Sequence, residues 1–271
     1  MKFKLFTFAY ENNGIWKNSI LAEKIATLHY LKNGFTEDEI LNFHVEDIQE
    51  LCEKYPEHFT KTPWMYGFFL WKPYLFLKLM NIIDYDDILI YSDIGSLTTG
   101  KIKETLTKFL REEDMFFWKE SIPMYKDCKR DLFYYFKVDY EKYKDYPLFR
   151  GCFWAYKKTE RTVFYMQKIF ENMCKMENVD HEIRIENNPE GFVVNHPCQS
   201  VPTLTLINLG FDYIKFYNNM EKFLNENRDI ELLIHVCRSI RSFSGFEEAC
   251  TKLNFSESEK EYLSQFYINY V

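Results

Sequence analysis

The hydrophobic pattern of the chain begins with a strand-like stretch. Apolar and polar positions alternate in KFKLFTFAY, residues 2–10, which predicts a core strand, and ENNG after it predicts a turn. A continuous apolar run at 88–91, ILIY, predicts a strand that is buried on both faces. Two further strands are expected at 114–120 and 149–158.

Apolar residues at helical spacing predict helices between and after these strands. The expected helices lie at 15–33, 46–56, 65–84, 99–112 and 159–176, with a short helix or turn at 198–210 and two terminal helices at 231–243 and 256–271. Alternating strands and helices predict an α/β fold with a mostly parallel central sheet flanked by helices, followed by C-terminal helices.

Three stretches lack a clean period. TEDEI, residues 36–40, is expected to begin a capped, acidic helical turn. Residues 121–147 are rich in Lys, Tyr and Asp, and we expect a flap near the functional site, whereas 178–197 is expected to be an irregular excursion. No apolar run approaches the roughly 18 residues that a membrane span requires, and the first strand explains the N-terminus better than a signal peptide does.

Composition narrows the classes of function. The net charge is -7 and the pI is about 5.5, which argues against a nucleic-acid surface because phosphate binding depends on Lys and Arg. The seven cysteines are scattered, with no C-x-x-C, so neither a zinc knuckle nor a disulfide framework is expected. A reducing, cytoplasmic location is the simplest expectation. Aromatic residues make up 19% of the chain, which indicates either sugar-stacking surfaces or a general compositional bias.

The end of the 88–91 strand carries the first candidate for chemistry. ILIY is followed by S-D-I-G, which places Asp93 at the carboxyl end of a buried strand, with Gly95 ending it. Open α/β sheets bind ligands at the carboxyl ends of their strands. We therefore expect Asp93 to face a ligand.

Four motifs, in order, resemble a known family. G-F-F-L-W-K-P-Y begins at Gly67, and D-I-L-I-Y-S-D-I-G follows it; R-G-C-F-W-A-Y-K-K-T-E-R-T begins at Arg150, and H-P-C-Q-S-V-P-T-L-T-L-I-N-L-G begins at His196. Together they resemble the DxD-type glycosyltransferases of GT-A fold, in the nucleotide-diphospho-sugar transferase superfamily, of the capsular or viral glycan type. The resemblance covers about residues 3–215. It implies a GT-A-like, Rossmann-related sheet, with a catalytic domain at 1–215 and a helical extension at 216–271 packed on it.

The resemblance also implies a metal-dependent site. A nucleotide-sugar donor would bind with Mn2+ or Mg2+, which neutralises the diphosphate through hard oxygen ligands. Asp93 and His196 are the implied metal ligands, because Gly95 stands where D-x-D families carry a second carboxylate. His196 would favour Mn2+. Taken alone, His196 is equally a loop histidine before a proline.

The remaining site residues come from the same motifs and from their neighbours. The implied donor-binding residues are Thr7, Phe8, Ala9, Lys72, Tyr91, Ser92, Asp93 and Gln199. Gly151 is expected on the acceptor side, where it would let a sugar approach the backbone closely. Asp127 and Asp131 are candidate catalytic bases, with Asp139 beside them, although solvated loop carboxylates need no function. Lys72 could instead be a solvated lysine at a helix start.

Two classes of function follow from these motifs. The first is a hexosyltransferase-like glycosyltransferase that moves a sugar from a nucleotide-diphosphate-sugar, with a UDP-sugar favoured and a GDP-sugar possible, to a hydroxyl of a glycan acceptor. The second is a catalytically weak or inactive nucleotide-sugar-binding partner subunit, suggested by the missing second aspartate. A sugar-phosphate nucleotidyltransferase ranks last, because ENNG stands where a glycine-rich phosphate loop would follow the first strand.

Overall fold

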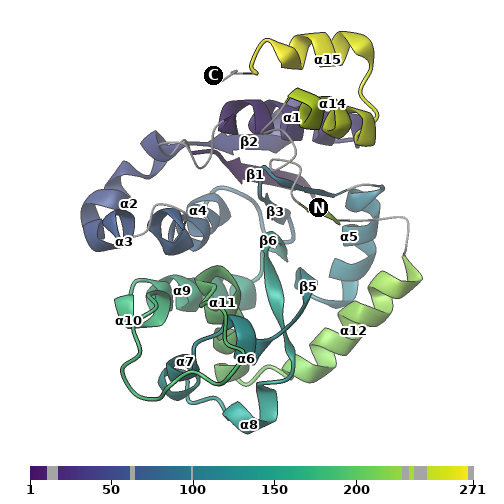
Figure 1. Ribbon diagram of the computed structural model, residues 1–271. Coiled ribbons are helices and arrows are strands. Elements are labelled where there is room, and N and C mark those ends of the chain that lie inside the picture. Colours follow the sequence, from purple (N-terminus) through teal and green to yellow (C-terminus); the bar gives the residue numbers. More distant parts are fainter. Residues whose placement is uncertain (11–17, 62–64, 99, 228–231, 235–242, 268–271) are drawn as a thin grey trace.

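The chain folds around one central sheet (Figure 1), seen in a computed structural model that describes residues 1–10, 18–61, 65–98, 100–227, 232–234 and 243–267. The sheet has five strands in the order β2-β1-β3-β6-β5. Their bounds are β1 Phe3–Phe8, β2 Ile40–Phe43, β3 Ile88–Ser92, β5 Met115–Pro123 and β6 Pro147–Lys157. β1 pairs in parallel with β2 and β3, whereas β6 runs antiparallel to both β3 and β5. Four strands of this sheet therefore share one direction, and β6 is reversed.

Helices cover both faces of the sheet (Figure 1). The longer ones are α1 Ser19–Lys32, α4 Trp71–Met80, α5 Ile102–Glu112, α9 Glu160–Met173, α11 Pro197–Asn208, α12 Tyr213–Glu226, α14 Phe243–Lys252 and α15 Glu257–Ser264. The shorter ones are α2 Gln49–Lys54, α3 Pro56–Thr60, α6 Met124–Asp127, α7 Arg130–Tyr135, α8 Tyr140–Tyr143 and α10 Met176–Val179. A 3₁₀ turn at Tyr66–Phe69 leads into α4.

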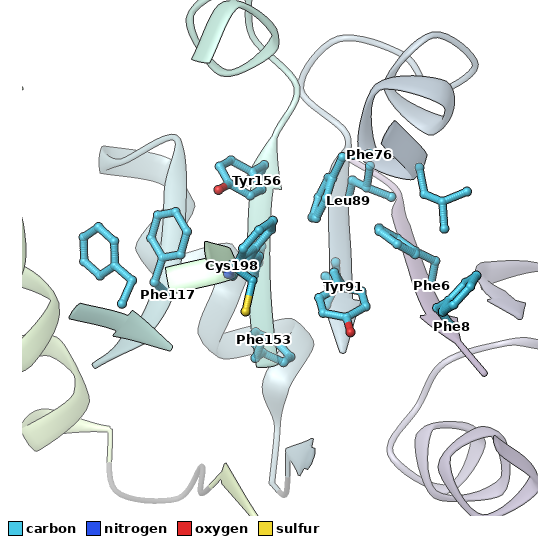
Figure 2. Packing of buried hydrophobic residues seen from close by; sticks show 14 of the residues in the cluster. Phe6, Phe8, Phe76, Leu89, Tyr91, Phe117, Phe153, Tyr156 and Cys198 are labelled. Carbon is cyan, nitrogen blue, oxygen red and sulfur yellow. The ribbon is translucent and has the colours of Figure 1, made fainter. Parts of the chain in front are cut away.

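Aromatic side chains fill the space between the sheet and these helices (Figure 2). Phe76 of α4 packs against Phe6 of β1 and Trp154 of β6, with ring centroids 4.9 and 5.7 Å apart. On the opposite face, Phe109 of α5 packs against Phe116 of β5 at 5.4 Å. All five residues of β3 are buried, which confirms the strand predicted to be covered on both faces.

The predicted fold class is confirmed: the protein is α/β, with a mostly parallel central sheet flanked by helices and with helices near its C-terminus. The strands expected at 2–10, 88–91, 114–120 and 149–158 correspond to β1, β3, β5 and β6. The helix expected at 15–33 is α1 from residue 19 onward, and its first predicted residues lie mostly outside the described part of the chain.

Other local predictions are wrong. The helix expected to begin at 36–40 is one 3₁₀ turn, Glu37–Glu39, that leads into strand β2. Pairing with β1 decides this segment, because the β2 residues are held in parallel register from Ile40 to Phe43. The expected flap at 121–147 instead contains α6, α7 and α8, and its residues Leu132 and Phe133 are buried.

The C-terminal part also differs from the prediction. Residues 232–234, expected to be helical, form strand β7, which pairs antiparallel with β4, Ser96–Thr98. Residues 235–242 of that predicted helix lie outside the described part of the chain. The boundary expected between residues 215 and 216 falls inside α12, whose Phe223 packs on Phe109 of α5 at 4.8 Å. Helices α14 and α15 lie on the outer side of α1, away from the central sheet (Figure 1). In the described residues, no helix combines the length and the apolar character needed to cross a bilayer.

Candidate functional site

Asp93 stands at the carboxyl end of β3, in the middle of the sheet. Its backbone N–H donates to the carbonyl oxygen of Cys152 at 2.8 Å, which extends the pairing of β3 with β6 by one residue. The side chain of Asp93 is 38% exposed, whereas Ser92 before it is fully buried and donates to the carbonyl oxygen of Ser96 at 2.8 Å. The strand therefore buries Ser92 and leaves the carboxylate of Asp93 partly exposed.

Lys72 lies behind Asp93 and is almost completely buried. Its ammonium Nζ is 3.1 Å from Oδ1 of Asp93 and 2.7 Å from the carbonyl oxygen of Gly151. Only 1% of the residue is exposed, so the alternative of a solvated lysine at a helix start is wrong. The ring of Tyr91 lies 4.5 Å from Nζ, and that of Phe69 lies 4.8 Å away, which places the cation among aromatic faces.

The turn before α4 explains how Lys72 reaches this position. Gly67, Phe68 and Phe69 all have positive φ, at 60°, 48° and 63°. A Cβ added to Gly67 would lie 2.3 Å from the ring of Phe59, so the turn requires glycine there. Backbone strain of this kind is held in place by the surrounding packing. The turn directs the first residues of α4 toward the end of β3.

Gly151 lies where α11 packs onto β6. A Cβ at Gly151 would lie 2.5 Å from Sγ of Cys198, so helix α11 itself, rather than a bound sugar, makes the close approach expected at this glycine. Burial raises the pKa of the Cys198 thiol to about 11 and that of Cys152 to about 12. Both thiols are therefore protonated at neutral pH and pack rather than react.

His196 and Asp127 meet beside the start of α11. Nε2 of His196 is 3.9 Å from Oδ2 of Asp127, and the His196 backbone N–H donates to the Asp127 carbonyl oxygen at 3.0 Å. Burial, together with the charge of Glu120, raises the pKa of Asp127 to about 6, and burial lowers the pKa of His196. Glu120 in turn pairs with Arg150 at 3.0 Å. At neutral pH the imidazole is neutral, and Asp127 takes up a proton more readily than an ordinary carboxylate.

Asp131, the second candidate base, holds a loop. Its carboxylate accepts backbone N–H groups from Arg184 at 2.7 Å, Glu186 at 2.9 Å and Ile185 at 3.2 Å. Only 1% of Asp131 is exposed, so these donors occupy the carboxylate that a base would need free. Asp139 caps α8, where it accepts the N–H of Lys142 at 3.2 Å. Of the three carboxylates, Asp127 is the one whose surroundings favour proton transfer.

The residues expected to hold the nucleotide at the end of β1 are buried. Thr7 donates to Oδ1 of Asn42 at 2.9 Å, Phe8 stacks on Trp71 with centroids 4.1 Å apart, and the N–H of Ala9 donates to the carbonyl oxygen of Phe43 at 2.9 Å. Each of Thr7, Phe8 and Ala9 is at most 3% exposed. In this structure all three are packed in the core at the end of β1.

The sequence analysis did not identify a contact between a buried carboxylate and a histidine near these residues. Glu23 of α1 is 4% exposed, and its Oε2 lies 2.6 Å from Nε2 of His44, which follows β2. Thr27, one turn along α1, accepts from the side chain of Asn42 at 3.1 Å. A single signal was available in the sequence: Glu23 lies within an apolar helical stretch, next to Leu21 and Ala22.

Gln199 brings an unsatisfied polar atom to the first turn of α11. Its Oε1 is buried and has no hydrogen-bond partner among the described residues. Buried polar atoms without partners are rare, and each one calls for an explanation such as a ligand or a bound water. Gln199 was implied as a donor-binding residue, and its buried Oε1 is an acceptor that the described residues leave unsatisfied.

Asp93 and His196, the two metal ligands that the resemblance implies, carry donor atoms of the types that bind divalent cations. The described part of the chain has no group of three or more His, Cys, Asp or Glu side chains that could hold a metal. Asp93 and His196 would be two ligands, and phosphate and water oxygens would complete the shell. Asp93 keeps a partly exposed carboxylate, and His196 is neutral at pH 7, the form that binds metals.

Comparison with known proteins finds distant similarity among solved structures and no match elsewhere. No known family model matches the sequence, and no curated protein matches it. Among solved structures, the chain is similar to the crystal structure of mouse xyloside xylosyltransferase 1 in its apo form. The identity is 11% over 78% of this chain and 82% of that chain, and the TM-score is 0.41. A TM-score of this size assigns neither a family nor an activity to the chain.

Proposed function

We propose that the protein is a metal-dependent, hexosyltransferase-like glycosyltransferase that moves a sugar from a nucleotide-diphosphate-sugar to a hydroxyl of a glycan acceptor. The observation that carries the proposal is Asp93, a partly exposed carboxylate at the carboxyl end of the central strand, held from behind by the buried Lys72. Ligands bind at this edge of open α/β sheets. The four ordered motifs supply the reaction class, and a UDP-sugar is the favoured donor, with a GDP-sugar possible.

The residues around Asp93 and α11 have roles in this reaction. A divalent ion, Mn2+ or Mg2+ at Asp93 and His196, would supply positive charge to the diphosphate of the donor. The N-terminus of α11 adds the positive end of its dipole, which favours anions. Gln199 would accept a hydrogen bond from a donor hydroxyl or amide.

The transfer step balances without a further reactant. The bond between the anomeric carbon and the phosphate oxygen breaks, and its electron pair leaves with the nucleotide diphosphate. The acceptor oxygen bonds to the anomeric carbon, and its proton goes to a base. Asp127 is the proposed base, because its pKa of about 6 lies close to working pH, where general bases are most effective.

A second function keeps the binding site and loses the chemistry. Gly95 stands where a second carboxylate would bind metal, and one oxygen of Asp93 is already held by Lys72. A nucleotide-sugar-binding partner subunit with weak or no turnover would have this arrangement. The two functions differ in a single property, the release of nucleotide diphosphate from the donor.

The test is a transfer assay with a matched pair of variants. Purified protein with Mn2+ is given UDP- and GDP-sugars and a panel of glycan acceptors, and released nucleotide diphosphate is measured. We expect Asp93→Asn to lower the rate by roughly 100-fold or more, because it removes the carboxylate that would hold the metal ion beside the leaving group. Asp84→Asn, at the other end of β3 and 77% exposed, is expected to leave the rate unchanged. Equal rates in the wild type and Asp93→Asn would exclude the proposed site, and donor binding without turnover would favour the partner subunit.

A further inference from the structure

Two hydrogen-bond donors among the described residues bond to the same oxygen of Asp93. The ammonium of Lys72 and the hydroxyl of Tyr91 both bond to Oδ1. Tyr91 is 1% exposed and lies two residues before Asp93, on the same face of β3. With Oδ1 occupied, Oδ2 is the oxygen left to meet a ligand. The carboxylate is therefore fixed in one orientation and offers one oxygen.

The position of Lys72 gives it no direct route to a ligand. Two of its N–H groups point to Oδ1 of Asp93 and the carbonyl oxygen of Gly151, and rings of four aromatic residues lie within 6 Å of Nζ. Burying an ammonium is unfavourable unless it is paired and hydrogen-bonded. Lys72 meets both conditions only because Asp93 and Gly151 converge on it from β3 and β6.

The positive charge of Lys72 also changes what Asp93 can bind. A carboxylate with an ammonium 3.1 Å away has a net charge near zero when viewed from the exposed side. Such a pair attracts a divalent cation far less than a lone carboxylate does, because the two charges act on the cation with opposite sign. Lys72 opposes the binding of a cation less when the cation is already bound to a diphosphate anion, because the anion offsets the charge of the cation.

Resting on the proposed function, we propose that Lys72 is a positioning residue that fixes and charge-balances Asp93, so that the divalent cation enters the site together with the nucleotide diphosphate and not before it. Lys72 itself does not touch the donor. The absence of a second carboxylate favours the same joint binding, because a second negative charge would let the cation bind alone.

The test measures Mn2+ binding from the electron paramagnetic resonance signal of the free ion, with and without UDP or GDP, relative to the Mn2+ that the same nucleotide binds in the absence of protein. For the wild type we expect Mn2+ to bind at least about 100-fold more tightly when the matching nucleotide is present. For Lys72→Met we expect Mn2+ alone to bind about tenfold more tightly than to the wild type, because the opposing charge is gone. Tyr91→Phe removes a hydrogen bond from the same oxygen without a change of charge, and we expect no such gain.

The outcomes separate this inference from the function on which it rests. If the wild type binds Mn2+ equally well with and without nucleotide, or if Lys72→Met binds Mn2+ alone no better than the wild type, the role of Lys72 is overturned while nucleotide binding stands. If the wild type binds neither nucleotide at all, the proposed function falls and the inference falls with it. If Lys72→Met does not fold, equal Mn2+ binding by the wild type with and without nucleotide still overturns the inference.

Discussion

Nε2 of His196 lies 3.9 Å from Oδ2 of Asp127, and both side chains are largely withdrawn from water. The pair joins the start of α11 to the end of α6, so a predicted metal ligand and a predicted base are neighbours. Burial lowers the pKa of the imidazole. Burial, together with the negative charge of Glu120, raises the pKa of the carboxyl. Of the two, Asp127 is the group that takes up a proton closer to neutral pH than an ordinary carboxyl does.

Asp127→Asn is expected to lose activity and gain stability. A carboxyl whose pKa is raised from 3.8 to about 6 holds its proton more tightly in the folded state. The free energy of unfolding of the wild type therefore falls as pH rises from about 4 to 6, and it stays lower above pH 6. The asparagine variant lacks this loss, so it should exceed the wild type by on the order of 1 to 2 kcal/mol at pH 7.5, and by less at pH 4.5.

Urea unfolding at the two pH values checks the sign. Asp145→Asn changes an exposed carboxyl in the same part of the chain and should stay within about 0.5 kcal/mol of the wild type. A transfer assay on the same proteins tests the base: we expect Asp127→Asn to be slower by about 100-fold or more. A variant that is more stable yet fully active would remove Asp127 from the mechanism.

Asp131→Ala should destabilise the fold. It leaves three backbone N–H groups, those of residues 184–186, without their acceptor. Unmade hydrogen bonds to a buried charged group cost about 2 to 4 kcal/mol in total. Chemical denaturation measures the loss, and Asp145→Ala serves as the exposed comparison, expected within about 0.5 kcal/mol of the wild type. A loss of that small size in Asp131→Ala would show that the loop does not depend on this carboxylate.

Gly151→Ala should be destabilising, and a second substitution should partly rescue it. The added Cβ would meet Sγ of Cys198 at 2.5 Å, which costs about 1 to 3 kcal/mol through displaced packing. Cys198→Ala removes the sulfur but leaves its own Cβ 3.3 Å and its carbonyl oxygen 3.2 Å from the new methyl group. A double-mutant cycle by thermal unfolding should therefore show a favourable coupling. Strictly additive effects would mean that the new methyl group fits between β6 and α11 without strain.

The sequence predicts the interior of this fold better than its edges. ILIY at 88–91 is apolar without interruption, and a strand covered on both faces is the arrangement that such a run favours. Strand β2 was missed because ILNF at 40–43 is short and follows an acidic turn, so only its pairing with β1 makes it a strand. Strand β7 was missed for the same reason, since it pairs with β4 from far along the chain.

The sequence predicts individual residues of the candidate site but not the contacts between them. Asp93 could be found because the strand before it is so regular. The burial of Lys72 depends on Gly151, 79 residues away, and on the turn of three positive φ values before α4, and no local pattern encodes either contact. Asp127 and Asp131 look alike in the sequence, and the loop that bonds to Asp131 is what separates their roles.

The central claim is that Asp93 binds a nucleotide-diphosphate donor together with a metal ion, and thermal unfolding tests it most directly. The purified protein and Asp93→Asn are each scanned with UDP-, GDP-, dTDP- and CMP-sugars, with and without Mn2+. A ligand that binds only the folded state at 100 times its Kd adds about 2.7 kcal/mol, which raises the midpoint by several degrees. We predict such a rise for the wild type with one nucleotide class, only when Mn2+ is present, and no rise for Asp93→Asn. A wild-type midpoint that none of these donors moves would contradict the account.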